Sequence, residues 1–140
     1  MRKFILLSLF SVFLISFFYS CQTAEKMQQD TYYVNGRDIY IKHCQNCHGE
    51  HGEGLGELTP PLTDSVFMRA HKQQLACIIK NGIAAPVVIH GKTYEGRMPD
   101  FNLADIDVAQ LIVYITNGFG HKQGMYTTEQ VAADLKNCKP

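Results

Sequence analysis

The chain has 140 residues, the size of a single domain. Hydrophobic residues make up 46% of it and charged residues 19%, so its composition is that of a globular protein and excludes a disordered one. The 13 basic and 13 acidic residues cancel, and because no basic run is present, binding to nucleic acid is not expected.

The first residues have the pattern of an export signal. Arg2 and Lys3 give a positive start, and residues 4–19 form an uncharged apolar run. A run of that length is marginal for a membrane span and typical of a signal-peptide core. Cys21 follows closely, as the lipid-bearing cysteine does in bacterial lipoproteins, which this start resembles.

The expected organisation of this region is therefore a lipoprotein signal peptide at residues 1–20 and a lipidated Cys21 that begins a flexible polar tether over residues 21–33. The alternatives are an ordinary signal peptide with an unmodified cysteine and an uncleaved anchor. The number of cysteines also fits export, because unmodified cysteines can pair as disulfides in an oxidising compartment.

The next segment predicts a helix and then a loop. Asn35 is a good N-cap for a helix that runs to about His48, where Gly49 can end it. The four glycines and two prolines within residues 49–63 predict a loop.

A second helix is expected over residues 65–80, capped by Asp64 and ended by the Asn81-Gly82 pair. Residues 87–89 and 92–94 could then form a short hairpin.

A third helix is expected over residues 104–117, where apolar residues recur at helical spacing, and a last short helix follows Thr127, whose partner Gln130 completes a capping box. Because no other strand pattern is convincing, the predicted class is mostly α.

Residues 44–48 read Cys-Gln-Asn-Cys-His, the Cys-x-x-Cys-His pattern of covalent haem attachment. A spacing of three puts Cys44 and Cys47 on one side of a helical turn, where two thiols can add to the two vinyl groups on one side of a porphyrin. His48 then follows as the nitrogen ligand of the iron.

The residues of this motif have two other possible roles. A redox dithiol of Cys44 and Cys47 would need a strand before it and a helix after it, whereas a helix and a glycine loop flank the pair. A zinc site of Cys44, Cys47 and His51 lacks a second Cys or His pair at ligand spacing.

Met98 is the candidate for the second axial ligand. It lies in a Gly-Arg-Met-Pro segment before the third helix, and Pro99 restricts the backbone where a ligand must be held. His90 is the rival ligand. Surface or haem-edge positions are expected for His51, His71, His90 and His121.

These features resemble the monohaem domain of the class I cytochromes c, over about residues 34–120. Three motifs carry the resemblance: the run from Gly36 and Tyr40 through the haem-attachment pattern to Gly49, the glycine-rich loop that ends in Pro60-Pro61-Leu62, and residues 91–99 followed by Leu111, Tyr114 and Ile115. Residues 121–140 lie outside the resemblance, as a C-terminal extension.

The resemblance implies three to five helices wrapped around one covalent haem c. It implies that Gly36 and Tyr40 cross the third helix at Leu111 and Tyr114. A carbonyl at Pro60 or Pro61 should accept the Nδ1 proton of His48.

Tyr94 and Arg97 are implied to lie near the haem propionates. The chain departs from the family at Ala104, where relatives place a capping Ser or Thr, and Asn102 could cap the helix earlier.

The resemblance also implies an electron-transfer protein and not an enzyme, since a haem held by His48 and Met98 has no open iron site. The alternatives are a peroxidase-like enzyme and a fixed subunit of an oxidase, reductase or dehydrogenase complex. Expected partners are redox proteins of these kinds and the membrane that holds the lipid. The expected location is the periplasmic face of a bacterial membrane.

Five cysteines are present, and lipid and haem account for three of them. The other two, Cys77 and Cys138, are expected to form a structural disulfide in an oxidising compartment. Cys138 shares a helix face with Val131 and Leu135, which need cover, and Cys77 lies on the polar side of the second helix. The alternative is two unrelated free thiols.

Overall fold

The computed structural model of the protein describes residues 2–138, without the side chains of residues 2, 6–7 and 17–23. The chain divides into two compact units, Met1–Thr31 and Tyr32–Pro140, and each is described by itself. The second unit begins two residues before the predicted domain start at Val34. The elements are α1 (Arg2–His43), α2 (Gln45–His48), α3 (Ser65–Ala70), the 3-10 helix η1 (Lys72–Gln74), α4 (Leu75–Asn81), β1 (Val87–Ile89), β2 (Lys92–Tyr94), α5 (Asp105–Asn117) and α6 (Thr128–Leu135).

Helices account for 57% of the chain and strands for one small sheet, so the predicted mostly α class is confirmed. The first unit is helical throughout its described residues, as the first part of α1. Its described side chains between residues 3 and 16 are exposed. Within the described residues, no helix combines the length and apolar character that crossing a membrane requires. Cys21 lies in α1, and its side chain lies outside the description.

The predicted helix start at Asn35 is wrong. Asn35 lies inside α1, which runs to His43, and residues 22–33 are helical where an irregular tether was expected. The physical reason is composition, because residues 22–34 hold no Gly or Pro and are rich in Gln, Glu, Lys and Met, which propagate a helix. The predicted end is confirmed, since Gly49 follows α2 with a φ of 82°.

The single helix expected over residues 65–80 is also wrong, since α3, η1 and α4 divide this segment. Asp64 caps α3 as predicted, accepting hydrogen bonds from the N–H groups of Val66 and Phe67. The break falls at His71, whose ring stacks on Phe67 at 4.0 Å and donates through Nδ1 to the Phe67 carbonyl. This local bond competes with continuation of the helix.

The remaining elements agree closely with expectation. β1 and β2 pair antiparallel, with Val88 opposite Thr93, so the hairpin is confirmed. Thr127 and Gln130 form the predicted capping box of α6. α5 begins with Ala104 as an N-cap that makes no side-chain hydrogen bond, and Asn102 does not replace it.

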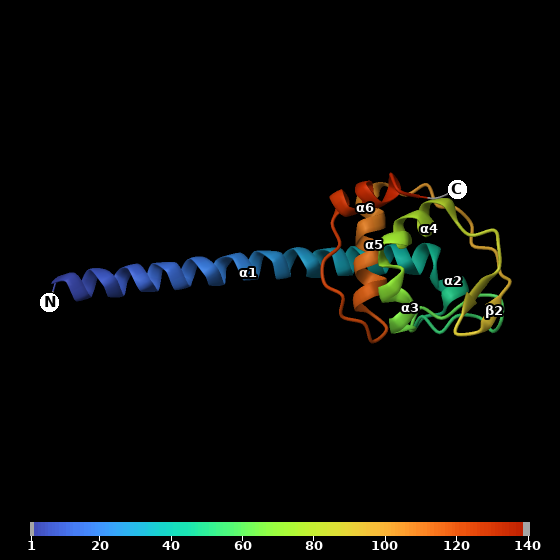
Figure 1. Ribbon diagram of the computed structural model, residues 1–140, viewed down its shortest axis with the longest axis horizontal. Coiled ribbons are helices and arrows are strands. Elements are labelled where there is room, and N and C mark those ends of the chain that lie inside the picture. The colour runs from blue at the N-terminus through green and yellow to red at the C-terminus, as the bar shows by residue number, and fades with distance from the viewer. Residues whose placement is uncertain (1, 139–140) are drawn as a thin grey trace. The chain divides into compact units, whose positions relative to one another are not determined.

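The core of the second unit is built around α5. The helices α4, α5 and α6 lie side by side (Figure 1), and α5 contributes an uninterrupted buried run from Leu111 to Thr116. α1 crosses α5 at Gly36, where a Cβ atom would lie 2.0 Å from the Gln110 carbonyl oxygen. Tyr40, one turn further, packs its ring 5.2 Å from that of Tyr114. The helix crossing implied by the resemblance is therefore present.

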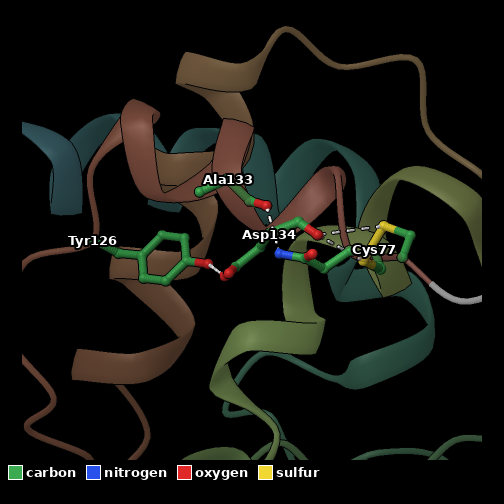
Figure 2. Close-up of a disulfide and its surroundings, with 6 residues drawn as sticks. Cys77, Tyr126, Ala133 and Asp134 are labelled. Carbon is green, nitrogen blue, oxygen red and sulfur yellow. Dashed lines mark hydrogen bonds between the residues drawn. A yellow bond between two sulfur atoms is a disulfide. The ribbon is translucent and has the colours of Figure 1, made fainter.

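A disulfide joins α4 to the residues after α6. Cys77 and Cys138 are bonded, with 5.6 Å between their Cα atoms, and they are 61 residues apart in sequence. Figure 2 shows the bond beside Asp134, whose carboxylate accepts a hydrogen bond from the Tyr126 hydroxyl. The extension is thus tied to the core by a covalent bond and by packing of Val131, which is fully buried.

Replacing Gly36 should destabilise the helix crossing. In Gly36→Ala the new methyl group must displace the backbone at Gln110, so overpacking costs roughly 1–3 kcal/mol, against a gain in helix propensity of about 1 kcal/mol. We expect a lower free energy of unfolding in urea. The exposed neighbour Asn35 supplies the control, because Asn35→Ala should change stability by no more than about 0.5 kcal/mol. Equal stability of both variants would contradict the close crossing.

Removing the disulfide should loosen the C-terminal extension. Closing a loop of this length stabilises a fold by up to about 4 kcal/mol on chain-entropy grounds, so Cys77→Ala/Cys138→Ala should lower the melting temperature. Thiol labelling of denatured, unreduced wild type is the direct check. Reaction at Cys77 and Cys138 would rule the bond out.

Candidate functional site

The four residues predicted to hold a haem meet at one cavity. Cys44, Cys47 and His48 come from the junction of α1 with α2, and Met98 comes from the segment after β2. α2 and the hairpin lie at the same end of the unit (Figure 1). Residues fifty positions apart in sequence therefore face a common space.

A second cavity adjoins the first and shares with it Cys44, His48, Pro60, Ile83, Val87 and Met98. Its walls are apolar. The other residues that line it are Tyr40, Leu62, Phe67, Met68, Leu75, Ile78, Ile79, Ile89, Leu111 and Ile115. A planar apolar group that entered between His48 and Met98 would be surrounded mostly by hydrocarbon, as ligands in such pockets are.

His48 is oriented by a backbone carbonyl. Its Nδ1 donates to the carbonyl oxygen of Pro60 at 3.2 Å, so of the two carbonyls that the resemblance offered, the structure selects Pro60. Burial lowers the pKa of His48, and the bond to Pro60 offsets part of that change. The neutral ring, which is the form that binds a metal, is favoured.

Cys44 and Cys47 have different surroundings. Cys44 is half-buried, and burial, with a smaller contribution from Cys47, raises the pKa of its thiol to about 12. Cys47 is exposed. The two thiols are not joined to each other, so both are available to add to a porphyrin.

The loop that carries Pro60 is held by backbone bonds around the motif. Gly54 N–H donates to the His48 carbonyl at 2.8 Å, and Leu62 N–H donates to the Gly52 carbonyl at 2.7 Å. Gly54 has a φ of 74°, and a Cβ atom there would lie 2.4 Å from the Thr59 carbonyl oxygen. Only glycine fits a backbone that is both left-handed and this crowded.

The segment of Met98 is held in a comparable way. Met98 and Ile83 exchange backbone hydrogen bonds, each of 2.9 Å. Gly82 lets this bridge form, because a Cβ atom there would lie 2.4 Å from the Met98 carbonyl oxygen. On the other side Gly96 lies against Leu58, and a Cβ atom at Gly96 would lie 1.9 Å from the Leu58 carbonyl oxygen.

Other predicted residues fall at the same cavity or away from it. Tyr94 and Arg97 both line it, Tyr94 buried and Arg97 exposed. His90, the rival ligand, lies outside both cavities and pairs through Nε2 with the Asp64 carboxylate at 2.6 Å. Among the residues that the structure describes, no three His, Cys, Asp or Glu side chains gather as a metal site, so the zinc reading has no geometry behind it.

The position expected for His121 is wrong. It is buried, with 5% of its surface exposed, where a surface or haem-edge position was expected. Its Nε2 donates to the Leu62 carbonyl oxygen at 2.6 Å. No local signal marks it, because its partner lies 59 residues earlier in the chain.

This set of residues fits a covalently bound haem: two unpaired thiols, an oriented neutral imidazole and a thioether around apolar walls. Comparison with known proteins agrees. Residues 33–115 match the family described as cytochrome c oxidase, cbb3-type, subunit III.

Two relatives are both named cytochrome c-552, one from Thermus thermophilus and one from a specified strain of that species. Each is 25% identical over 108 residues, covering 70% of this chain and 82% or 72% of the relative. Because the family match covers more than half of the chain and the site has the required residues, the chain belongs to the cbb3-type cytochrome c oxidase subunit III family, as a class I monohaem cytochrome c domain that binds haem c covalently.

Proposed function

We propose that this domain carries single electrons between redox proteins outside the cytoplasm while a lipid on Cys21 tethers it to the periplasmic face of a bacterial membrane. The observation that supports electron transfer is the meeting of Cys44, Cys47, His48 and Met98 at one cavity with apolar walls. The export-signal pattern before Cys21 supports the location.

Bound haem c supplies a reversible Fe(III)/Fe(II) couple. Cys44 and Cys47 would hold the group through two thioether bonds. His48 would bind the iron through Nε2, because its Nδ1 proton is already donated to Pro60. Met98 would supply the second protein ligand from its bridged segment, and a thioether in that role favours the ferrous state and raises the potential relative to a second histidine.

The walls and the mouth of the cavity have separate tasks in this proposal. Leu75, Ile79 and Leu111 exclude water, which keeps the change in solvation small when the charge of the iron changes. The exposed Cys47, Leu58 and Arg97 line the first cavity, where a partner can approach the haem edge. Transient redox partners bury little surface, so no large apolar patch is needed.

The proposed role is that of a carrier and not of an enzyme, because His48 and Met98 would both bind the iron and leave it no site for a substrate. Peroxidase-like chemistry would require Met98 to leave the iron, and the backbone bridge between Met98 and Ile83 keeps the methionine segment at the cavity.

A second candidate function is a fixed subunit of a terminal oxidase. The family description, which names subunit III of a cbb3-type oxidase, favours an oxidase as the partner. A free carrier that serves such an oxidase and a resident subunit would use the same residues. Purification in mild detergent would separate the two, since a resident subunit should co-purify with the oxidase at stoichiometric yield.

Replacing Met98 should remove the sixth ligand. Oxidised wild type should show the weak far-red sulfur-to-iron band, and Met98→Ala should abolish it and lower the midpoint potential. Met68 is a matched control, because it also lines the apolar cavity and is buried. Met68→Leu conserves volume and should keep the band. Persistence of the band in Met98→Ala would identify a different ligand.

Replacing Cys21 should release the protein from the membrane. Cys21→Ser should leave a haem-loaded protein in the soluble fraction, or stall removal of the signal, whereas Gln28→Ser should remain with membranes. Mass spectrometry of the mature N-terminus is the measurement. An unmodified Cys21 on a processed chain, or a start at another residue, would contradict the lipid anchor.

A further inference from the structure

We propose that His121 is a positioning residue for the iron ligand His48, acting through the loop that carries the Pro60 carbonyl. This proposal rests on the proposed function in one respect, since it takes His48 as the ligand. His121 lies beyond residues 33–115, which match the family, so the role would belong to the extension and not to the matched motifs.

The first step is the bond between His121 and Leu62. A carbonyl oxygen only accepts, so the 2.6 Å contact places a proton on His121 Nε2 and makes the ring a donor. The ring is almost fully buried, and its own backbone N–H donates to the Gly118 carbonyl at 2.9 Å. Loss of this donor would leave the partly buried Leu62 carbonyl without this partner, which costs more than losing a bond at the surface would.

The second step leads from Leu62 to His48. Pro60 and Pro61 precede Leu62, and each has a fixed φ, so this segment is stiff and a shift at Leu62 moves the Pro60 carbonyl. The Leu62 N–H is held as well, by the Gly52 carbonyl at 2.7 Å. Leu62 is therefore held at its N–H by the loop and at its carbonyl by His121. Because the segment is stiff, the position of Leu62 determines the position of the Pro60 carbonyl that accepts from His48.

The third step is a strained turn that aims the extension at this loop. Phe119 has a φ of 51°, a left-handed conformation that a non-glycine residue adopts at a cost. Its ring lies 2.8 Å from the Cβ position of Gly52 and 5.4 Å from the ring of Tyr40. Phe119 and His121 thus contact the loop side by side, one through packing and one through a hydrogen bond.

The turn is itself anchored to the helices. Asn117, at the end of α5, donates to the Gly124 carbonyl and accepts from the Gly124 N–H, both at 2.8 Å. Lys72 donates through Nζ to the Gln123 carbonyl at 3.0 Å. His121 is consequently mounted on a fixed support, as a positioning residue must be.

The chemical consequence concerns the donor strength of His48. A firm Nδ1–H···O bond to Pro60 raises the basicity of the imidazole and stabilises the ferric state, so a loosened bond should raise the midpoint potential. A side chain with a purely structural role would change the melting temperature without changing the potential.

The test compares three variants of the haem-loaded full chain by potentiometry and by NMR of the hyperfine-shifted His48 ring protons. His121→Leu removes the donor and should raise the potential and shift the His48 signals. His121→Gln, whose amide nitrogen can replace Nε2, should bring both back toward wild type. Thr127→Ala breaks the cap of α6 in the same extension, at a distance from the loop, and should lower the melting temperature with the potential unchanged.

An unchanged potential in a folded His121→Leu, or a shift that His121→Gln does not reverse, would overturn the proposal. If His121→Leu fails to fold, a measurement of proton exchange on the wild type still tests the proposal. The His121 Nε2 proton should exchange with water far more slowly than a ring proton of the exposed His90, and equal exchange would overturn the proposal. Failure of the proposed function would look different, because His48 would then show no hyperfine shift in wild type.

Discussion

The hydrogen bond between His48 Nδ1 and the Pro60 carbonyl is the constraint on which the rest of the site depends. An imidazole can rotate about two bonds, and only a fixed acceptor keeps its second nitrogen directed into a cavity. The acceptor is a backbone atom of a loop, so the loop must be as rigid as a helix. Bonds from Gly54 to His48 and from Leu62 to Gly52 provide that rigidity, and glycines occupy the places where carbonyls come closest.

The opposite side of the cavity meets the same requirement by a different device. The side chain of Met98, the proposed iron ligand, is flexible, and a thioether on an unconstrained loop would leave an iron readily. The backbone bridge to Ile83, which follows the end of α4, attaches that loop to the helical core. Residues of α4 also line the apolar cavity, so the helix that supports the methionine segment also excludes water from the site.

The C-terminal extension connects stability with the site. Its disulfide to Cys77 fixes it to α4, its Val131 enters the core, and its first residues contact the loop of Pro60. Destabilising the extension at its far end and releasing it from the loop at its near end are therefore separable changes. The extension is thus part of the domain in physical terms, although it lies outside the matched motifs.

The sequence by itself determined the features that depend on residues close together in the chain. The Cys-x-x-Cys-His spacing, the Asp64 and Thr127 caps and the glycines that end helices all act within a few residues, and the structure contains each of them. Local signals give the wrong structure where two competing ones are close in energy. Asn35 is a good cap, but the helix formers before it continue α1 instead, and the His71 ring interrupts a segment whose pattern reads as one helix.

Only the tertiary structure decided which distant groups meet. The choice of Pro60 over Pro61, the pairing of His90 with Asp64 outside the cavity and the burial of His121 against Leu62 all depend on how loops far apart in sequence pack together. The physical reason is that a hydrogen bond or a side-chain contact is specified by position in space, and loop positions follow from the packing of the whole core. A pattern along the chain can name the residues that are able to bind a haem, but the packed core determines how they are held.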